Sequence, residues 1–298
     1  MERHLPPDLH DLTPRGRRPG KVAAPYVLLA PGGLWLLLLF IVPMIATASV
    51  ALQEGSALEG YRLTWHFANF SDAISTHGDI LIRSLRNGVI VTAAGLLLAY
   101  PIAYWIAFYG GRFKNVFLFL LLLPFFVSFV IRTVSWSFIL QDDGIVFGTL
   151  KDIGLLSTDY RVLGKTLAVL AGITYNLLPF TILPLYVSLE RIDKSFVEAA
   201  KDLYATRFEA FRKVVFPLSL PGVFAAILLT SIPAVGDYIN ADVLGGPGTA
   251  MIGNQIQEQF LQARDYPEAA ALAFILMGIM LVGAVVYARV LGTEEITT

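Results

Sequence analysis

The chain has 298 residues, of which 56% are hydrophobic and only 15% are charged. A soluble domain carries about 25% charged residues, so the composition excludes an ordinary soluble protein and indicates one built largely within a membrane. The formal net charge of −1 indicates no class of partner, and the lack of cysteine excludes disulfides, thiol chemistry and cysteine-bound metals.

Six apolar runs are long enough to cross a bilayer, since about 18 or more consecutive apolar residues are typical of a spanning helix. In chain order we expect these spans at residues 26–52, 88–109, 116–140, 167–189, 218–239 and 269–291. In lipid the backbone must satisfy its own hydrogen bonds, and the alternation typical of barrel strands is absent. The sequence therefore predicts an all-α membrane protein with six transmembrane helices over residues 25–298.

The first span follows a tail, residues 1–24, that is polar, proline-rich and basic. We expect this tail to be disordered, and either to help set the topology or to touch anionic lipid. The run at 26–52 is longer than the roughly 7–15 apolar residues of a signal peptide, so we interpret it as a retained span. Lys and Arg are concentrated in the tail and in the loop at residues 190–217. The positive-inside rule therefore predicts that both termini and this loop are cytoplasmic.

Two ionisable residues lie within the expected spans, where charge is costly and is a functional signal by default: Arg132 in the third span and Asp237 late in the fifth. One interpretation is that they pair and hold two helices together. The other is that Asp237 contacts a cationic substrate, with aromatic and polar neighbours along the pathway. Those neighbours are Tyr238, Trp136, Tyr175 and Asn176.

Signals for catalysis or for a bound cofactor are weak. The four histidines lie outside the spans and lack metal-site spacing. The run Gly164-Lys165-Thr166 imitates the end of a phosphate-binding P-loop, but Asp159 occupies the position of the required glycine. We therefore expect no metal, no cofactor, no nucleic-acid partner and no enzymatic activity in this chain.

The loop at residues 190–217 carries two helix-start signals. Ser195 and Glu198 fit a capping box, in which a hydroxyl accepts a backbone N–H and the glutamate reaches back, and Thr206 and Glu209 repeat the pattern. We expect two short helices, the first from about Ser195 and the second ending near Pro217.

The second of these helices presents an apolar knob beside basic residues. Phe208, Phe211 and Arg212 recur at helical spacing, which suits docking into a cleft of a soluble partner. An amphipathic helix lying on the bilayer is the alternative.

The loop resembles the "EAA" loop of ABC-importer permeases. Glu198-Ala199-Ala200 matches the name-giving triplet, and Val214 and Phe216-Pro217 stand at the positions of the family's Ile-x-Leu-Pro run. Tyr204 stands where the family has glycine. Since tyrosine resists positive φ, we expect the family's tight turn either to shift towards Ala205 or to give way to a straighter helix.

The runs that begin at Pro124, Leu178, Leu244 and Ile252 look like the spermidine/putrescine-type branch, although permeases for ferric ion, thiamine, aminophosphonate and opines share much of this pattern. The resemblance implies a type I ABC-importer permease of the bacterial inner membrane, with the loop at 190–217 as its coupling helix. It implies a second permease subunit, two cytoplasmic ATPase subunits that bind ATP and Mg, and an extracytoplasmic solute-binding protein.

The resemblance also assigns residues and a cargo. Glu198, Ala199 and Ala200 would pack at the ATPase-docking site, and Phe208, Phe211 and Arg212 would fill the cleft. The cargo would be a small cationic organic solute, such as a polyamine, moved by alternating access. One alternative is that the same class of permease moves another solute. Two further alternatives are an ion-gradient-driven secondary transporter, which would need acidic residues in several spans, and a membrane-embedded enzyme.

Overall fold

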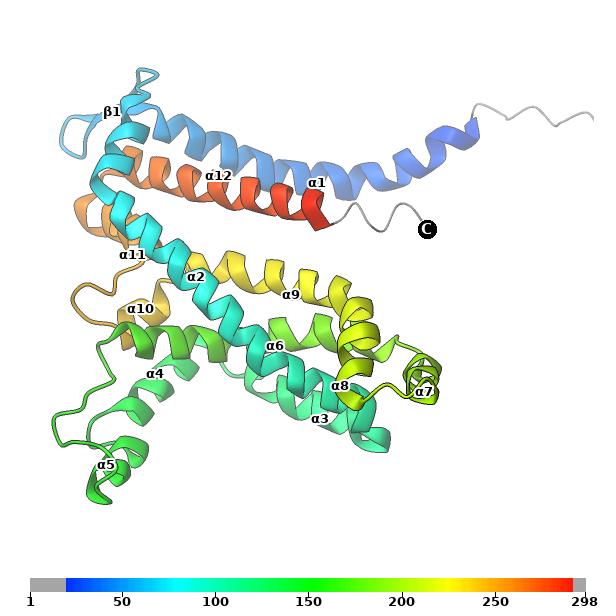
Figure 1. Ribbon diagram of the computed structural model, residues 1–298. Helices are drawn as coiled ribbons and strands as arrows, with labels where there is room; N and C mark the ends of the chain where they lie inside the picture. The colour runs from blue at the N-terminus through cyan, green and yellow to red at the C-terminus, as the bar shows by residue number, and fades with distance from the viewer. Residues whose placement is uncertain (1–19, 292–298) are drawn as a thin grey trace, which may run out of the picture. The chain divides into compact units, whose positions relative to one another are not determined.

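The computed structural model describes residues 20–291, and within them every regular element except one hairpin is helical (Figure 1). The first helix, α1 (Gly20–Ala51), carries no charged residue from Leu28 onward. The chain divides into two units, one up to Ser49 and one from Val50. The expected tail at 1–24 falls mainly on residues 1–19, which lie outside the described residues. The second unit carries the candidate sites.

A hairpin opens the second unit. Strands β1 (Gln53–Ser56) and β2 (Gly60–Leu63) pair antiparallel, and Asn69 Nδ2 donates to the carbonyl oxygens of Ala51 (3.0 Å) and Gln53 (2.8 Å). These bonds tie the hairpin to the start of α2 (Ala68–Tyr109). Helix α2 therefore begins well before the span expected at 88–109.

The run expected as one span at 116–140 is interrupted. Its elements are η2 (Gly111–Phe113), α3 (Lys114–Leu122), η3 (Leu123–Phe126), α4 (Phe129–Leu140) and, beyond it, α5 (Ile145–Asp152). The two halves meet at a bend of 92°. Pro124 lies at the start of η3, where it cannot donate a backbone hydrogen bond, and Val127 is extended. Counting this bent pair as one span, six of the described segments are long and apolar enough to cross a membrane.

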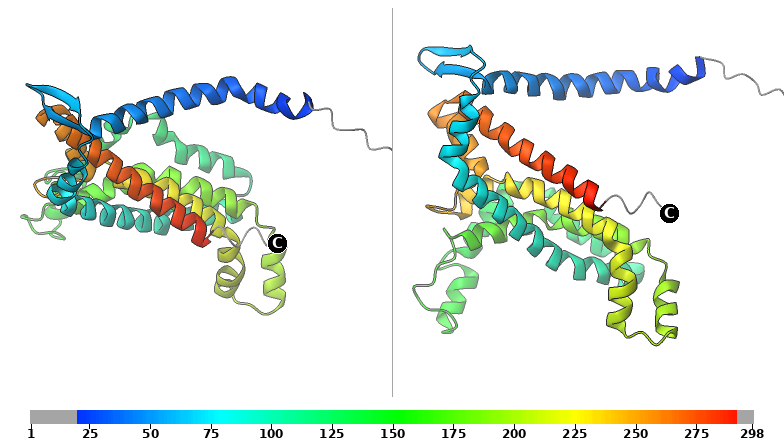
Figure 2. Two further views of the ribbon diagram at one scale, coloured as in Figure 1. Left: turned by 90° about the horizontal axis from the view of Figure 1, so that it is seen from above. Right: turned by 45° about the horizontal axis from the view of Figure 1, so that its top comes forward.

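The remaining helices complete an all-α membrane protein, as predicted. They are α6 (Thr166–Glu190), α9 (Phe216–Val235), α10 (Ile239–Leu244), α11 (Ile252–Glu258), η5 (Gln259–Ala263) and α12 (Tyr266–Leu291). Helices α2, α6 and α9 pack against one another and hold most of the core (Figures 1 and 2). Glycines allow the close approach: a Cβ on Gly88 would lie 2.3 Å from Val235, and one on Gly222 2.4 Å from Ser188.

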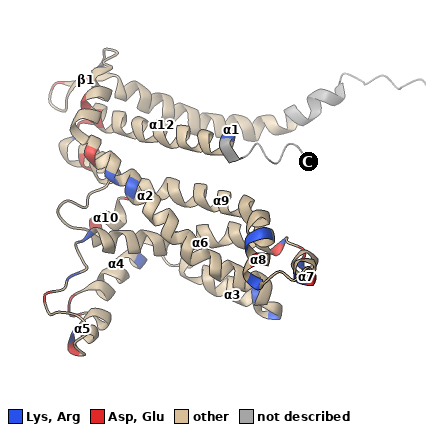
Figure 3. Ribbon diagram, viewed as in Figure 1, with Lys and Arg blue, Asp and Glu red and all other residues tan. Residues whose placement is uncertain are grey.

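A short helical pair projects from one end of these three helices. It consists of α7 (Lys194–Asp202), α8 (Arg207–Ala210) and a π-helical segment, η4 (Phe211–Val215), that runs into α9. Figure 2 shows this pair at the end of α9 opposite to α10 and α11. Between the two ends, α9 carries no charged residue and α6 carries only Glu190 (Figure 3). The charge and the candidate sites are therefore concentrated at the two ends.

Candidate functional site

The first candidate site is the projecting α7–α8 pair. The N-cap residue of α7 differs from the one that the sequence predicted. Asp193 caps α7, and its carboxylate accepts from the backbone N–H of Ser195 at 2.9 Å. This hydrogen bond holds the pKa of the Asp193 carboxyl below its usual range. The capping box predicted at Ser195 and Glu198 is therefore wrong, because an aspartate two residues earlier already occupies the cap position.

The second predicted capping box is confirmed. Thr206 Oγ1 accepts from the backbone N–H of Glu209 at 3.2 Å, and the Glu209 carboxylate accepts from the backbone N–H of Thr206 at 2.9 Å. Helix α8 therefore begins at Arg207, and the two reciprocal hydrogen bonds between Thr206 and Glu209 fix its start.

The turn between α7 and α8 forms at Tyr204 itself. This residue has a φ of 59°, in the left-handed region that favours glycine. The N–H of Tyr204 donates to the carbonyl of Lys201 (2.9 Å) and the N–H of Ala205 to that of Ala200 (3.0 Å), the pattern of a Schellman motif. Both expected alternatives, a turn shifted to Ala205 and a straighter helix, are wrong. The flanking caps and these two bonds outweigh the local preference of tyrosine.

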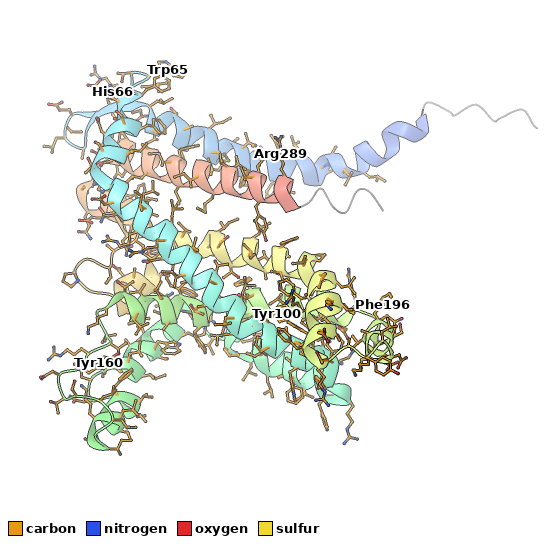
Figure 4. All side chains as sticks on the ribbon, in the orientation of Figure 1. Trp65, His66, Tyr100, Tyr160, Phe196 and Arg289 are labelled. Carbon is orange, nitrogen blue, oxygen red and sulfur yellow. The ribbon has the colours of Figure 1, made fainter. Side chains whose placement is uncertain are left out.

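The aromatic residues of the pair divide into two sets. Phe211 is half-buried, and its ring meets those of Tyr100 and Tyr104 on α2 edge to face, with centroids 5.7 and 5.8 Å apart. Tyr100 lies where α2 passes the α8 segment, and Phe196 lies on α7, at the projecting end (Figure 4). Phe208 is 68% exposed. Phe211 therefore joins the pair to the spans, whereas Phe208 is free to meet a partner.

A cavity of about 320 Å³ lies between α7, η4 and the end of α2, and both charged loop residues and apolar or aromatic residues line it. Glu198 lines it, together with Lys201, Arg207 and Tyr104. Glu198, Ala199 and Arg212 are exposed, Ala200 is half-buried, and the Tyr204 side chain is almost fully exposed. The sequence-predicted docking residues thus lie together on the projecting pair, and among them Phe211 packs against α2.

The second candidate site is the break between α9 and α10, where Asp237 lies. Its Oδ1 accepts from the backbone N–H of Asn240 and its Oδ2 from the Asn240 side chain, both at 2.8 Å. Among the ion pairs of the described residues, none joins Asp237 to Arg132. Of the two interpretations left open by the sequence, the structure does not support the pairing of these residues.

Asn240 connects Asp237 by hydrogen bonds to two further buried polar side chains. Its Oδ1 accepts from Asn176 Nδ2 (3.1 Å) on α6 and from Thr133 Oγ1 (3.2 Å) on α4. Asn176 Nδ2 also donates to Thr133 Oγ1 at 3.0 Å. We call Asp237, Asn240, Asn176 and Thr133 the break cluster. It brings together two residues that the sequence singled out, Asp237 and Asn176, through two that it did not.

The other pathway candidates lie around the same helices. The Arg132 guanidinium lies over the rings of Phe125 and Phe129, 5.3 and 5.7 Å from their centroids, and its buried Nε has no hydrogen-bond partner. Trp136 and Tyr175 meet edge to face at 5.3 Å. Tyr238, in the break, is 41% exposed.

Asn87 is one of several further buried polar residues that sequence reasoning missed. Asn87 on α2 is 1% exposed, and neither atom of its carboxamide has a hydrogen-bond partner. It was missed because the expected span began at residue 88, which left Asn87 in a loop. A hydropathy window extended over one more helical turn would have found it. Within residues 20–291, no group of three or more His, Cys, Asp or Glu side chains could hold a metal.

Comparison with known proteins gives a consistent match. The family model described as "Binding-protein-dependent transport system inner membrane component" matches residues 92–292. The spermidine/putrescine transport system permease protein PotB of Haemophilus influenzae is 34% identical over 258 residues, covering 86% of this chain and 90% of the relative. PotB of Escherichia coli is 34% identical over 253 residues, covering 83% and 91%.

A further relative and a solved structure agree. The inner membrane ABC transporter permease protein YdcU of Escherichia coli is 36% identical over 217 residues, covering 68% of each chain. Among solved structures, a chain of a bacterial ABC transporter involved in the import of the acidic polysaccharide alginate superposes with a TM-score of 0.68. It is 19% identical and covers 94% of this chain and 98% of its own. At that identity the likeness shows the fold alone.

Proposed function

The chain belongs to the family of binding-protein-dependent transport system inner membrane components, and from this premise we propose that it is the permease subunit of a polyamine importer. The cargo would be spermidine, putrescine or a close analogue. The observation that carries this assignment is the 34% identity to PotB over most of both chains. A cargo of ferric ion, thiamine, an aminophosphonate or an opine, and an ion-gradient-driven mechanism, lack a comparable supporting observation.

The chemistry of the break cluster supports a cationic cargo. Asp237 is a carboxylate within the membrane part of the chain, and it uses its two oxygens only as acceptors from Asn240. An ammonium group has three N–H donors and no acceptor, so it complements a carboxylate directly. We propose that Asp237 contacts the cargo and that Tyr238, Trp136 and Tyr175 line the pathway beside it.

Arg132 has the opposite role in this proposal. It carries a positive charge held over Phe125 and Phe129, so it repels an ammonium group and confines the cargo to the side of Asp237. Asn176, next to Asn240, is the neutral hydrogen-bonding residue on that side.

The α7–α8 pair would be the coupling element. We propose that Glu198, Ala199, Ala200, Tyr204, Phe208 and Arg212 dock onto a cytoplasmic ATPase subunit. Phe211 would carry the movement to α2 through Tyr100 and Tyr104. Two such ATPases would bind ATP and Mg, so that this chain needs no cofactor. A second permease and an extracytoplasmic binding protein would complete the importer, with both termini cytoplasmic.

The experiment that tests the assignment is purification of this chain with its natural partners, followed by a ligand screen on the binding protein. We expect an ATPase and a binding protein to co-purify, and spermidine or putrescine to raise the melting temperature of that binding protein. Stabilisation by anions and not by polyamines would contradict the cargo, and the absence of an ATPase would contradict the importer class.

A further inference from the structure

Both oxygens of the Asp237 carboxylate are held by one residue. The backbone N–H of Asn240 donates to Oδ1 and the side-chain Nδ2 of the same residue donates to Oδ2, each at 2.8 Å. A carboxylate held at both oxygens cannot rotate freely about its last torsion. The direction in which Asp237 presents its charge is therefore set by Asn240.

Asn240 is in turn held by two other helices. Its Oδ1 accepts from Asn176 Nδ2 on α6 and from Thr133 Oγ1 on α4, and its exposed fraction is 0%. A Cβ on Gly172 would lie 2.7 Å from Asn240 Oδ1, so α6 also confines the carboxamide by contact. The position of the Asp237 charge is thus tied to the relative placement of α4, α6 and α10.

The donors and acceptors of these hydrogen bonds fix which end of the Asn240 carboxamide faces each partner. Because the Asp237 carboxylate only accepts, Asn240 Nδ2 must face it, which turns Asn240 Oδ1 towards Asn176 Nδ2 and towards the Thr133 hydroxyl, whose single proton is shared with Phe129 O. Asn240 uses two of about four acceptor positions of the carboxylate, which leaves the others for a ligand. Asn176 Oδ1 is buried without a partner and is a further unused acceptor. The unused capacity of the cluster is therefore mainly on the acceptor side, since its one spare donor is the second N–H of Asn240 Nδ2, and this suits a ligand that only donates.

We propose that Asn240 is a positioning residue that aims the Asp237 carboxylate at the cargo's ammonium group and couples its direction to α4 and α6. This inference rests on the proposed function, since it presumes that Asp237 contacts the cargo. It goes further in assigning a role to a residue that touches no cargo itself. Movement of α4 against α6 would pull on both donors to Asn240 and turn the carboxylate, so the affinity for the ammonium group would differ between the two access states.

The test is a double-mutant cycle on coupling, in the complete importer reconstituted in proteoliposomes with saturating binding protein. The readout is spermidine taken up per ATP hydrolysed. We expect Asp237→Asn and Asn240→Ala each to lower this ratio by about tenfold, the size expected when a hydrogen bond to a charged group is lost. In the Asp237→Asn background, Asn240→Ala should have no further effect, because Asn240 acts through Asp237. Additive losses would overturn the positioning role.

A second pair of variants covers the case in which Asn240→Ala fails to fold. Thr133→Val removes one donor to Asn240 without touching Asp237, and it should lower the ratio. Thr174→Val is its matched control, since Thr174 donates only to Leu170 O within its own helix, and it should leave the ratio unchanged. If Asp237→Asn has no effect, the pathway assignment fails. If Asp237→Asn lowers the ratio and neither Asn240→Ala nor Thr133→Val does, the positioning role alone is contradicted.

Discussion

The ring of Phe211 meets the ring of Tyr104 edge to face, with centroids 5.8 Å apart, and this contact joins the projecting α7–α8 pair to α2. Phe208, three residues earlier, is largely exposed. Two aromatic residues that the sequence grouped as one docking knob therefore have different tasks. We propose that Phe208 binds a partner and that Phe211 transmits the partner's movement to the spans.

Phe211→Ala should uncouple the importer without dissociating it. The substitution removes the edge-to-face contacts with Tyr100 and Tyr104, worth about 0.5–1.5 kcal/mol each beyond area burial, while the exposed docking face stays intact. We expect ATPase subunits to co-purify at the wild-type level and spermidine uptake to fall severely. The account of Phe211 is wrong if the ATPases dissociate, or if they stay bound and uptake remains at the wild-type level.

Phe208→Ala and Glu198→Lys should show the reverse pattern. Phe208 and Glu198 are exposed on the projecting pair, so their replacement changes the docking face and not the contact with α2. We expect the yield of co-purified ATPase to fall while the permease still inserts in the membrane. The exposed Phe196→Ala is a matched control on α7 and should lower co-purification less. Wild-type yields in both test variants would exclude the docking role.

Tyr204→Gly should stabilise the turn between α7 and α8. A residue other than glycine in the left-handed region costs about 1–2 kcal/mol, part of which is offset by the greater freedom of glycine in the unfolded chain. We therefore expect a gain of about 1 kcal/mol, seen as slower hydrogen exchange in this loop by mass spectrometry. Ala205→Gly is the matched control: its φ is not positive, so the loop should exchange faster. Equal or faster exchange in Tyr204→Gly would show that the tyrosine ring contributes more than the strain costs.

The loop between α7 and α8 shows which structural features could be predicted from the sequence and which could not. The capping box at Thr206 and Glu209 is a local pattern, and it is present as predicted. The conformation of Tyr204 is not set by its own residue type: two hydrogen bonds back to α7 and the Thr206 cap of α8 impose a backbone angle that tyrosine disfavours. Single-residue preference therefore indicated the wrong turn, although the family's spacing indicated the right place.

Less of the break cluster could be predicted from the sequence. Asp237 and Asn176 stood out because polar groups are rare in spans, but the partner of Asp237 depends on where α9 ends and α10 begins. The pairing with Arg132, one of the two interpretations left open, was weighed with residues 116–140 taken as one uninterrupted span, whereas the chain bends by 92° between η3 and α4. Asn240 and Thr133 gave no signal of their own, since their role comes from three helices meeting.

Gly172→Ala should damage the break cluster by crowding. The added Cβ would lie 2.3 Å from Leu244 and 2.7 Å from Asn240 Oδ1, so either α10 or the carboxamide must move. We expect a loss of about 1–3 kcal/mol in stability, measured as a lower melting temperature of the purified complex. Gly278→Ala is the matched control, because nothing lies within 4 Å of its Cβ, and it should not lower stability. Equal melting temperatures in the two variants would show that the packing at Gly172 can relax.

The most direct measurement is spermidine uptake by the importer in proteoliposomes, with and without ATP, for the wild type and for Asp237→Asn. We predict uptake that requires ATP, persists after any ion gradient is dissipated, and falls by tenfold or more in Asp237→Asn, since the charge is lost and one of the two oxygens that accept from Asn240 becomes a donor. Uptake that continues without ATP and stops with an uncoupler, or that is unchanged in Asp237→Asn, would contradict the account.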